Sequence, residues 1–376
     1  MKIPFHRPAL GKSGDLGEAE LSEVASVLKS GWLTTGPKTE HLEKEFREAS
    51  GAPFAAAVSS CTAGLHVALT ALGIGPGDEV ITSPLTFCAT VQAIQQTGAT
   101  PVLADVGCDG NIDPSAVEAH ISARTRAILP VRLGGLPCDM ARLGPLARQH
   151  SLFLVEDAAH ADPFCGASDS DAAVYSFYAT KSMTSGEGGM VTTCYEDLDR
   201  RIRRLSLHGI ERPAGNPAWK YEVVEAGFKY NLSDIQAAVG LAQLRRLPET
   251  RRALRAIAGY YHSRFRNVEE IELPPGMENP AHSCHLYSIR LNPAKLGFSR
   301  DEFMIRLEAR GVSASVHFIP VPLHRAFAQL CANPAHEYPR AMALFPRLIS
   351  LPIYASLTPE QAEYVADAVI AVARGG

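Results

Sequence analysis

The predicted fold is built around Ala172-Ala-Val-Tyr-Ser-Phe-Tyr-Ala-Thr-Lys181-Ser-Met-Thr-Ser-Gly-Glu-Gly-Gly-Met-Val191. An apolar run typical of a buried strand ends in a polar loop with one lysine, and three glycines and a second apolar run follow. Lys181 has two interpretations. Most lysines lie at the surface, whereas a lysine in a partly desolvated pocket has a lowered pKa, and its amine can attack a carbonyl carbon to form a Schiff base. This stretch alone is compatible with both.

The composition is that of a globular protein with a large core. Of its 376 residues, 46% are hydrophobic and 20% are charged, which suffices for more than one domain. The net charge of -4 gives no electrostatic reason to expect nucleic acid or an anionic membrane as a partner. No run approaches the roughly 18 apolar residues of a membrane span, and the N-terminus lacks an apolar signal-peptide core. We therefore expect a cytoplasmic protein without a membrane partner.

The eight cysteines are scattered through apolar or turn segments and form no Cys-x-x-Cys pair. This pattern favours free thiols in a reducing compartment over a disulfide framework or a zinc site. His282 and His285 have a spacing seen in metal sites, but no further residues complete a metal-binding pattern. We interpret both histidines as structural and expect no metal.

Strand-like and helix-like segments alternate along the first half of the chain. This order predicts right-handed βαβ units, and hence an α/β fold with a mostly parallel sheet that helices cover on both faces. Apolar runs typical of strands occupy residues 55–58, 79–82, 101–104, 127–131 and 152–155, and the segments with helical periodicity are 62–72, 87–97, 113–120 and 140–150.

The second half of the chain predicts a long helix and a smaller α/β domain. Pro248 is expected to end the long helix, and a second helix over residues 252–265 would connect the domains. We predict a large domain over residues 1–250 and a small domain over residues 251–376. The small domain would contain strands at 286–291, 312–317 and 349–351 and helices at 300–310 and 359–373.

Two polar segments follow predicted strands, at the strand ends where parallel sheets bind ligands. Ser59-Ser-Cys-Thr-Ala-Gly64 opens directly into a helix, so its free amides and hydroxyls suit a phosphate, although an ordinary helix cap is the simpler interpretation. Glu156-Asp-Ala-Ala-His160 places two acids at the end of a predicted buried strand. A carboxylate there is costly unless a cation or a hydrogen-bond donor meets it. A protonated ring nitrogen would meet Asp157, with His160 beside the ring. A metal ion is the competitor, but these ligands make a weak site.

Three strand ends thus offer three kinds of chemistry: hydroxyls and a helix N-terminus near Thr62, an acid at Asp157 and an amine at Lys181. A cofactor with a phosphate, a basic ring nitrogen and an aldehyde needs all three, and pyridoxal phosphate is such a cofactor. The acid would keep the ring nitrogen protonated. The lysine would hold the aldehyde and, once an incoming amine has displaced it, would move a proton.

Seven segments occur in order along nearly the whole chain: Ser60-Cys-Thr-Ala-Gly-Leu-His-Val-Ala-Leu69, Gly75-Pro-Gly-Asp-Glu-Val80, Glu156-Asp-Ala-Ala-His160, Ser176-Phe-Tyr-Ala-Thr-Lys181, Gly186-Glu-Gly-Gly189, Lys229-Tyr-Asn-Leu-Ser-Asp-Ile-Gln-Ala-Ala238 and Val316-His-Phe-Ile-Pro320. Together they resemble the motifs of the DegT and StrS sugar aminotransferases. The resemblance implies the type I aspartate aminotransferase fold, with a large domain around a sheet of the seven-stranded type, and pyridoxal phosphate as the cofactor.

The resemblance also implies roles for individual residues. Lys181 would be the Schiff-base lysine, Asp157 the partner of the pyridine nitrogen, and His160 the neighbour of the ring hydroxyl. The cofactor phosphate would be held by Thr62, Ala63 and Ser176, the ring face would be covered by Phe87, and the substrate would be contacted by Thr35, His208 and His317.

In this family the segment of Lys229 and Asn231 comes from the second subunit, so the resemblance implies a homodimer with shared active sites. Many members have Asn in place of Lys229. The Lys-Tyr-Asn variant resembles the branch that makes 4-amino-arabinose on a nucleotide carrier, and it leaves open whether Lys229 or Asn231 reaches the phosphate. Relatives that dehydrate sugars have histidine at the position of Lys181, so the lysine favours transamination.

The resulting hypothesis is an aminotransferase that moves an amino group from an amino acid, L-glutamate, to C4 of a keto sugar linked to a nucleotide diphosphate. Two alternatives stay open. One is a keto-cyclitol (scyllo-inosose type) aminotransferase of antibiotic biosynthesis, whose substrate lacks the nucleotide. The other is a non-catalytic regulatory protein that binds pyridoxal phosphate without turning a substrate over.

Overall fold

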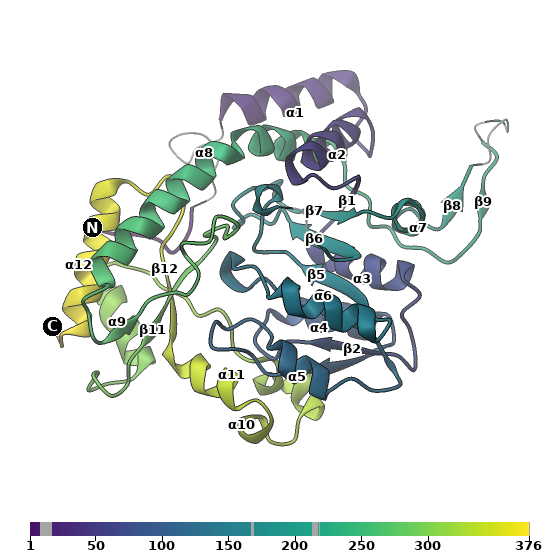
Figure 1. Ribbon diagram of the computed structural model, residues 1–376. Helices are drawn as coiled ribbons and strands as arrows, with labels where there is room; N and C mark the ends of the chain where they lie inside the picture. Colours follow the sequence, from purple (N-terminus) through teal and green to yellow (C-terminus); the bar gives the residue numbers. More distant parts are fainter. Residues whose placement is uncertain (8–16, 167–168, 213–216, 218, 376) are drawn as a thin grey trace.

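The structure is a computed structural model that describes residues 1–7, 17–166, 169–212, 217 and 219–375. A seven-stranded sheet forms the centre of the large unit (Figure 1). Its order is β1 (Phe54–Val58), β7 (Gly189–Thr193), β6 (Ala172–Ser176), β5 (Phe153–Asp157), β4 (Thr125–Leu129), β2 (Glu79–Thr82) and β3 (Thr100–Leu103). β7 runs antiparallel to both of its neighbours, and the strands from β6 to β3 run parallel. The predicted mostly parallel sheet is confirmed.

Helices cover both faces of this sheet. They are α2 (Pro37–Ser50), α3 (Cys61–Ala71), α4 (Cys88–Gln96), α5 (Pro114–Ala119), α6 (Met140–Gln149), α7 (Glu196–Ser206) and α8 (Asp234–Phe265), and α1 (Glu18–Ser30) packs on α8. Neighbouring strand residues point to opposite faces, so Val155 packs with α3 and α7 whereas Leu154 packs with α5 and α6. α2 and the first half of α8 cover the second face near β1, β6 and β7.

A smaller antiparallel sheet lies beyond α8 (Figure 1). It contains β10 (Ile271–Glu272), β11 (Tyr287–Leu291) and β12 (Leu348–Leu351), and α9 (Arg300–Ala309), α12 (Pro359–Ala373) and the second half of α8 share its core. The other short elements are β8 (Ile210–Glu211), β9 (Glu222–Val223), α10 (Pro334–Glu337) and α11 (Pro339–Leu344). Within the described ranges, the helices are too short or too polar to cross a membrane.

Two predictions about the second half of the chain are wrong. α8 continues across Pro248, with Leu247 and Leu254 buried on either side of it, so packing outweighs the loss of one backbone hydrogen bond. The proposed domain division at residue 250 falls inside this helix. Residues 312–317 form only isolated bridges, one with Ile3 and one with Ser350. Because these partners come from two separate segments, no continuous ladder forms.

Candidate active site

The residues whose side chains could bind a ligand or take part in a reaction lie together at the carboxyl edge of the large sheet. Ser60 follows β1, Asp157 ends β5 and Ser176 ends β6. The loop after β6 carries Lys181 and turns back into β7. Because β1, β5 and β6 point the same way, their carboxyl ends meet at this edge, which is where open α/β sheets bind ligands.

Asp157 is a buried carboxylate that, among the described residues, forms no ion pair within hydrogen-bond distance. One oxygen accepts a hydrogen bond from the Thr90 hydroxyl at 2.8 Å, and the other accepts one from the Ala159 amide at 3.1 Å. Burial raises the pKa of this carboxyl group, and the two hydrogen bonds and the Lys181 amine act in the opposite direction. A ligand with a positively charged N–H group would therefore complete the site.

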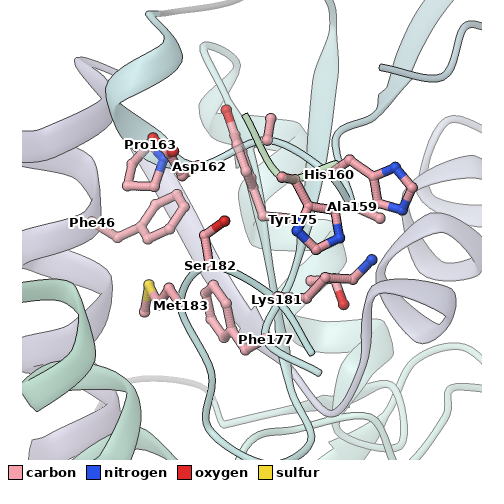
Figure 2. Close-up of a pocket in the computed structure, with 13 residues that line it drawn as sticks. Phe46, Ala159, His160, Asp162, Pro163, Tyr175, Phe177, Lys181, Ser182 and Met183 are labelled. Atoms are coloured by element: carbon pink, nitrogen blue, oxygen red, sulfur yellow. The ribbon is translucent and has the colours of Figure 1, made fainter. Parts of the chain in front are cut away.

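Lys181 is a desolvated amine beside this carboxylate. Burial lowers its pKa from 10.5 to about 8, although Cys61 and Asp157 oppose the shift. Such an amine is partly unprotonated near neutral pH, which attack on an aldehyde requires. Figure 2 shows Lys181 and His160 on one side of a small pocket and Phe46 on the other. Lys181 thus lies in a pocket, and the surface interpretation does not describe it.

His160 is a buried, neutral ring in the same pocket. Its Nδ1 accepts a hydrogen bond from the Gly134 amide at 3.1 Å, which places the proton on Nε2. The ring lies 4.6 Å from His285 and 5.7 Å from Phe318, measured between ring centroids. Burial and the charge of Lys181 hold the pKa of His160 well below its ordinary value. His160 is therefore a hydrogen-bond donor through Nε2 at neutral pH.

The turn between β1 and α3 combines a helix cap with open amides. The Ser60 hydroxyl caps α3 by accepting a hydrogen bond from the Ala63 amide at 3.0 Å, so the amide of Ala63, a predicted phosphate ligand, is already engaged within the chain, whereas the Ser60 O–H is still able to donate. The Cys61 and Thr62 amides, at the start of α3, have no intrahelical acceptor. A Cβ atom on Gly189 would lie 2.8 Å from the Cys61 nitrogen, so only glycine lets β7 pass this turn.

Ser176 and Phe87 lie at two edges of the same region. The buried Ser176 hydroxyl accepts a hydrogen bond from the Tyr178 amide at 3.3 Å. Phe87 precedes α4, and its side chain is 57% exposed, with its ring centroid 5.7 Å from that of Phe318. An exposed aromatic ring beside a buried carboxylate is available to cover a flat ligand. Thr90, three residues further along, donates a hydrogen bond to the Asp157 carboxylate. The start of α4 therefore positions both the aromatic ring and the acid.

Four predicted residues lie away from the Lys181 pocket. Lys229 donates a hydrogen bond to Asn231 at 2.5 Å, and Asn231 donates one to Thr35 at 2.7 Å. His208 is exposed, and its backbone amide donates to the Phe228 carbonyl. Among the described residues of one chain, those that line the pocket around Lys181 do not include Lys229, Asn231, Thr35 or His208.

Several histidines lie around Lys181 from distant segments: His285 lines the same pocket, and His317 and His6 line neighbouring cavities. His317 lies 2.9 Å from the Ser350 hydroxyl through Nδ1, and burial and Lys181 lower its pKa to about 4. His285, interpreted from the sequence as structural, instead packs against His160 in the pocket. His6 and Thr90 also carried no motif, and only the fold brings them here. Within the described residues, no group of three or more His, Cys, Asp or Glu side chains suits a metal ion.

A buried amine, a buried acid and an open helix N-terminus at one edge of such a sheet fit pyridoxal phosphate, and they define the class of type I aminotransferases. Residues 14–370 match the DegT/DnrJ/EryC1/StrS aminotransferase family. The chain is 42% identical over 386 residues to the Bacillus subtilis spore coat polysaccharide biosynthesis protein SpsC, covering 99% of this chain and 97% of that protein. The chain therefore belongs to the DegT/DnrJ/EryC1/StrS family.

Solved structures agree with this assignment. The PMP-form of the putative sugar aminotransferase Spr1654 from Streptococcus pneumoniae has a TM-score of 0.92 and 32% identity, over 100% of both chains. Its PLP-form has a TM-score of 0.90 and 31% identity, over 100% of this chain and 99% of that one. Helicobacter pylori PseC, an aminotransferase involved in the biosynthesis of pseudoaminic acid, has a TM-score of 0.91 and 27% identity over both full chains. The chain is thus a sugar aminotransferase that depends on pyridoxal phosphate, which confirms the predicted fold, enzyme class and cofactor.

Proposed function

We propose that this enzyme takes an amino group from L-glutamate and delivers it to C4 of a keto sugar linked to a nucleotide diphosphate, in the cytoplasm. The observation that carries the proposal is the Lys181 amine, whose pKa is lowered to about 8 beside the buried Asp157. SpsC and PseC support a sugar substrate, since their names refer to polysaccharide and pseudoaminic acid biosynthesis. The eight free cysteines agree with a reducing compartment.

When bound, pyridoxal phosphate supplies an electron sink for the carbon that loses a proton. We propose that Lys181 holds the cofactor, that Asp157 accepts a hydrogen bond from its ring nitrogen, and that Thr90 fixes the carboxylate that does so. The cofactor phosphate would be bound by the first amides of α3 and the hydroxyls of Thr62 and Ser176, and its ring would lie between Phe87 and the His160 side of the site.

Lys181 Nζ is also the group that we propose moves the proton. A pKa of about 8 lets the amine take up and release a proton near neutral pH, which is what a general acid and base needs. His160 does not compete for this proton, because its pKa is held well below the ordinary value and its Nδ1 already accepts the Gly134 amide. The substrate would contact His317, which lines a neighbouring cavity beside Gly134.

We propose a homodimer in which Lys229 and Asn231 complete the partner's site, with Thr35 and His208 at the same boundary. The exposed Trp32 and Leu33 lie three and two residues before Thr35 and offer apolar surface for an interface. A mixture of the inactive variants Lys181→Ala and Asn231→Ala tests this arrangement. Shared sites predict that reassembled hybrids regain roughly a quarter of wild-type activity, because half the dimers have one intact site. Without shared sites, mixing recovers nothing.

The function is tested by single-turnover spectroscopy. L-Glutamate should change the absorption band of the cofactor bound to the enzyme, and a nucleotide-linked 4-keto sugar should restore it. The matched control offers the 3-keto isomer of the same nucleotide sugar. Restoration by scyllo-inosose alone would identify the cyclitol aminotransferase instead. A band that responds to neither the amino donor nor any keto compound would identify a non-catalytic binding protein.

A further inference from the structure

The first seven residues lie between the unit built around the smaller antiparallel sheet and the loop after β6 that carries Lys181. Ile3 is fully buried, its amide donates to the Gly311 carbonyl at 2.7 Å, and its carbonyl accepts from the Ser313 amide at 3.0 Å. Phe5 stacks on His317 with 5.5 Å between the ring centroids. The sequence of this segment contains no motif, and the contacts come from a region more than 300 residues away.

His6 continues this segment to Lys181. The His6 ring forms a hydrogen bond with the backbone of Ala179, two residues before the lysine. Its Nε2 is buried and has no hydrogen-bond partner among the described residues. The bond to Ala179 therefore uses Nδ1, which must donate to a carbonyl oxygen, and this leaves a lone pair on Nε2.

A second small cavity lies on this side of Lys181. It is lined by His6, Lys181, His285, Tyr354 and other residues of both units. The Tyr354 hydroxyl is also buried without a hydrogen-bond partner within the described ranges, and its ring meets His6 edge-on at 6.3 Å. Two unpartnered polar atoms from separate segments therefore belong to side chains that line one cavity with the amine. Buried polar atoms of this kind cost free energy unless a partner reaches them.

The other groups around Lys181 are not equivalent acceptors. Asp157 already accepts hydrogen bonds from Thr90 and Ala159, and the buried Cys61 thiol stays protonated because its pKa is raised well above the ordinary value. His160 accepts the Gly134 amide through Nδ1, so its Nε2 carries the proton and cannot accept, and His317 lines a different cavity from the one that His6 shares with Lys181. The pKa of His285 is also held well below its ordinary value by burial. His6 is thus the ring whose free nitrogen is identified as an acceptor.

We propose that His6 Nε2 and the Tyr354 hydroxyl hold the Lys181 amine whenever it is not joined to the cofactor, so that the N-terminal segment positions the lysine between the half reactions. His6 is a positioning residue, since it acts through Lys181. The inference rests on the proposed function, because only a lysine that is released during turnover needs a second resting place. It also explains why a segment without a motif is packed so firmly against the site.

His6→Asn tests the proposal, because the Asn amide can keep the bond to Ala179 but cannot replace Nε2. The readout is the pH dependence with which the apoenzyme captures added pyridoxal phosphate at Lys181. Loss of an acceptor for the ammonium group should move the midpoint from about 8 to a value lower by roughly one pH unit. Tyr354→Phe should move it by about half as much. His6→Gln, with an acceptor near the position of Nε2, should restore the midpoint.

Phe5→Leu is the matched control, since it loosens the same segment and leaves the imidazole in place; its midpoint should stay at the wild-type value. A His6→Asn midpoint equal to that of the wild type would overturn the proposal. If His6→Asn does not fold, the ¹⁵N NMR signal of His6 Nε2 in the wild-type protein decides: it must shift when the cofactor binds, and an unchanged signal contradicts the proposal. Failure of the wild type to attach the cofactor at Lys181 would instead refute the proposed function.

Discussion

The last two residues of β5 are both buried acids, and they face opposite sides of the sheet. Glu156 is fully buried and forms an ion pair with Arg132 at 2.7 Å. Asp157 lies on the face toward α3, where its oxygens accept hydrogen bonds from Thr90 and Ala159. The chain supplies a hydrogen-bonded cation on one face, whereas on the other face the Lys181 amine acts on Asp157 without a hydrogen bond and leaves room for a positively charged ligand.

The two buried acids differ in where their positive partner comes from. A buried carboxylate is costly unless a cation or donors meet it. For Glu156 the cation is built into the fold, so the pair should matter for stability. For Asp157 the chain provides only neutral donors, and burial raises the pKa of the carboxyl group, so the residue should matter for cofactor binding and turnover. We therefore assign Glu156 a role in stability and Asp157 a role in cofactor binding, although the two acids are adjacent in sequence.

Asp157→Asn should show the largest effect on activity. The amide keeps the size of the side chain but cannot stabilise a protonated ring nitrogen, so we expect kcat/KM to fall by about 10³-fold. The unfolding free energy of the apoenzyme should change by less than about 1 kcal/mol, because the raised pKa shows that the buried charge is not itself stabilising. Steady-state kinetics and urea unfolding measure the two quantities. A destabilised but fully active variant would reverse the assignment.

Glu156→Gln should show the opposite pattern. Removal of one partner leaves the Arg132 charge buried and unpaired, which typically costs about 3–5 kcal/mol of unfolding free energy. The kcat of the folded fraction should stay within a few-fold of the wild type. Urea unfolding measured beside kcat at low temperature separates the effects. A loss of turnover as large as that of Asp157→Asn would contradict the comparison.

The double variant Arg132→Met/Glu156→Leu is the control for this interpretation. Arg132 Nε and Nη1 and Glu156 Oε2 have no hydrogen-bond partners among the described residues, so the pair is incompletely satisfied. Replacement of such a pair by apolar side chains is often neutral or stabilising. We therefore expect the double variant to regain most of the stability that Glu156→Gln loses. If it is no more stable than the single variant, the loss does not come from the unpaired charge.

Thr90→Val should give a smaller effect on the Asp157 face. It removes one hydrogen bond to a charged group, worth about 1.5 kcal/mol, so affinity for pyridoxal phosphate should fall by roughly tenfold. Thr90→Ser keeps the hydroxyl and should restore most of the affinity. Equilibrium titration followed by absorbance provides the numbers. Equal losses in both variants would show that Thr90 acts through packing and not through its hydroxyl.

His282→Asn should give the smallest effect, and it extends the comparison to the histidines. The Nδ1 of His282 accepts the Cys284 amide, and burial lowers its pKa to about 4. Between pH 6.5 and 4 the unfolded state therefore binds a proton that the folded state does not, so stability falls as the pH falls. Removal of His282 should reduce this slope by roughly 1 kcal/mol per pH unit. Urea unfolding at several pH values measures it, and an unchanged slope contradicts the assignment.

The sequence predicted the parts of the site that depend on short segments. Thr62, Asp157 and Lys181 each follow a recognisable strand, and the direction of parallel strands brings them to one edge. The pairing of Glu156 with Arg132 was not predictable from the two acids alone, because alternation places the residues on opposite faces only once the strand boundaries are known.

The remaining errors and omissions have a common cause in tertiary packing. Pro248 carries a strong local signal for a helix end, and α8 overrides that signal through its buried neighbours. His6 and His285 reach Lys181 from segments nearly 280 residues apart, and no local pattern marks them. Thr90 looks like an ordinary helix residue in the sequence. Only the structure shows that its hydroxyl, in the first turn of α4, donates a hydrogen bond to Asp157.

The most direct test of the account locates the cofactor on the chain. Enzyme loaded with pyridoxal phosphate is reduced with borohydride, digested and analysed by mass spectrometry, with Asp157→Asn treated in parallel. We predict that the reduced cofactor is attached to the peptide containing Lys181, at about one equivalent per chain, and that L-glutamate added before reduction removes the label. A label on another lysine, or a label on Lys181 that glutamate does not remove, would contradict the assignment of Lys181 as the catalytic amine.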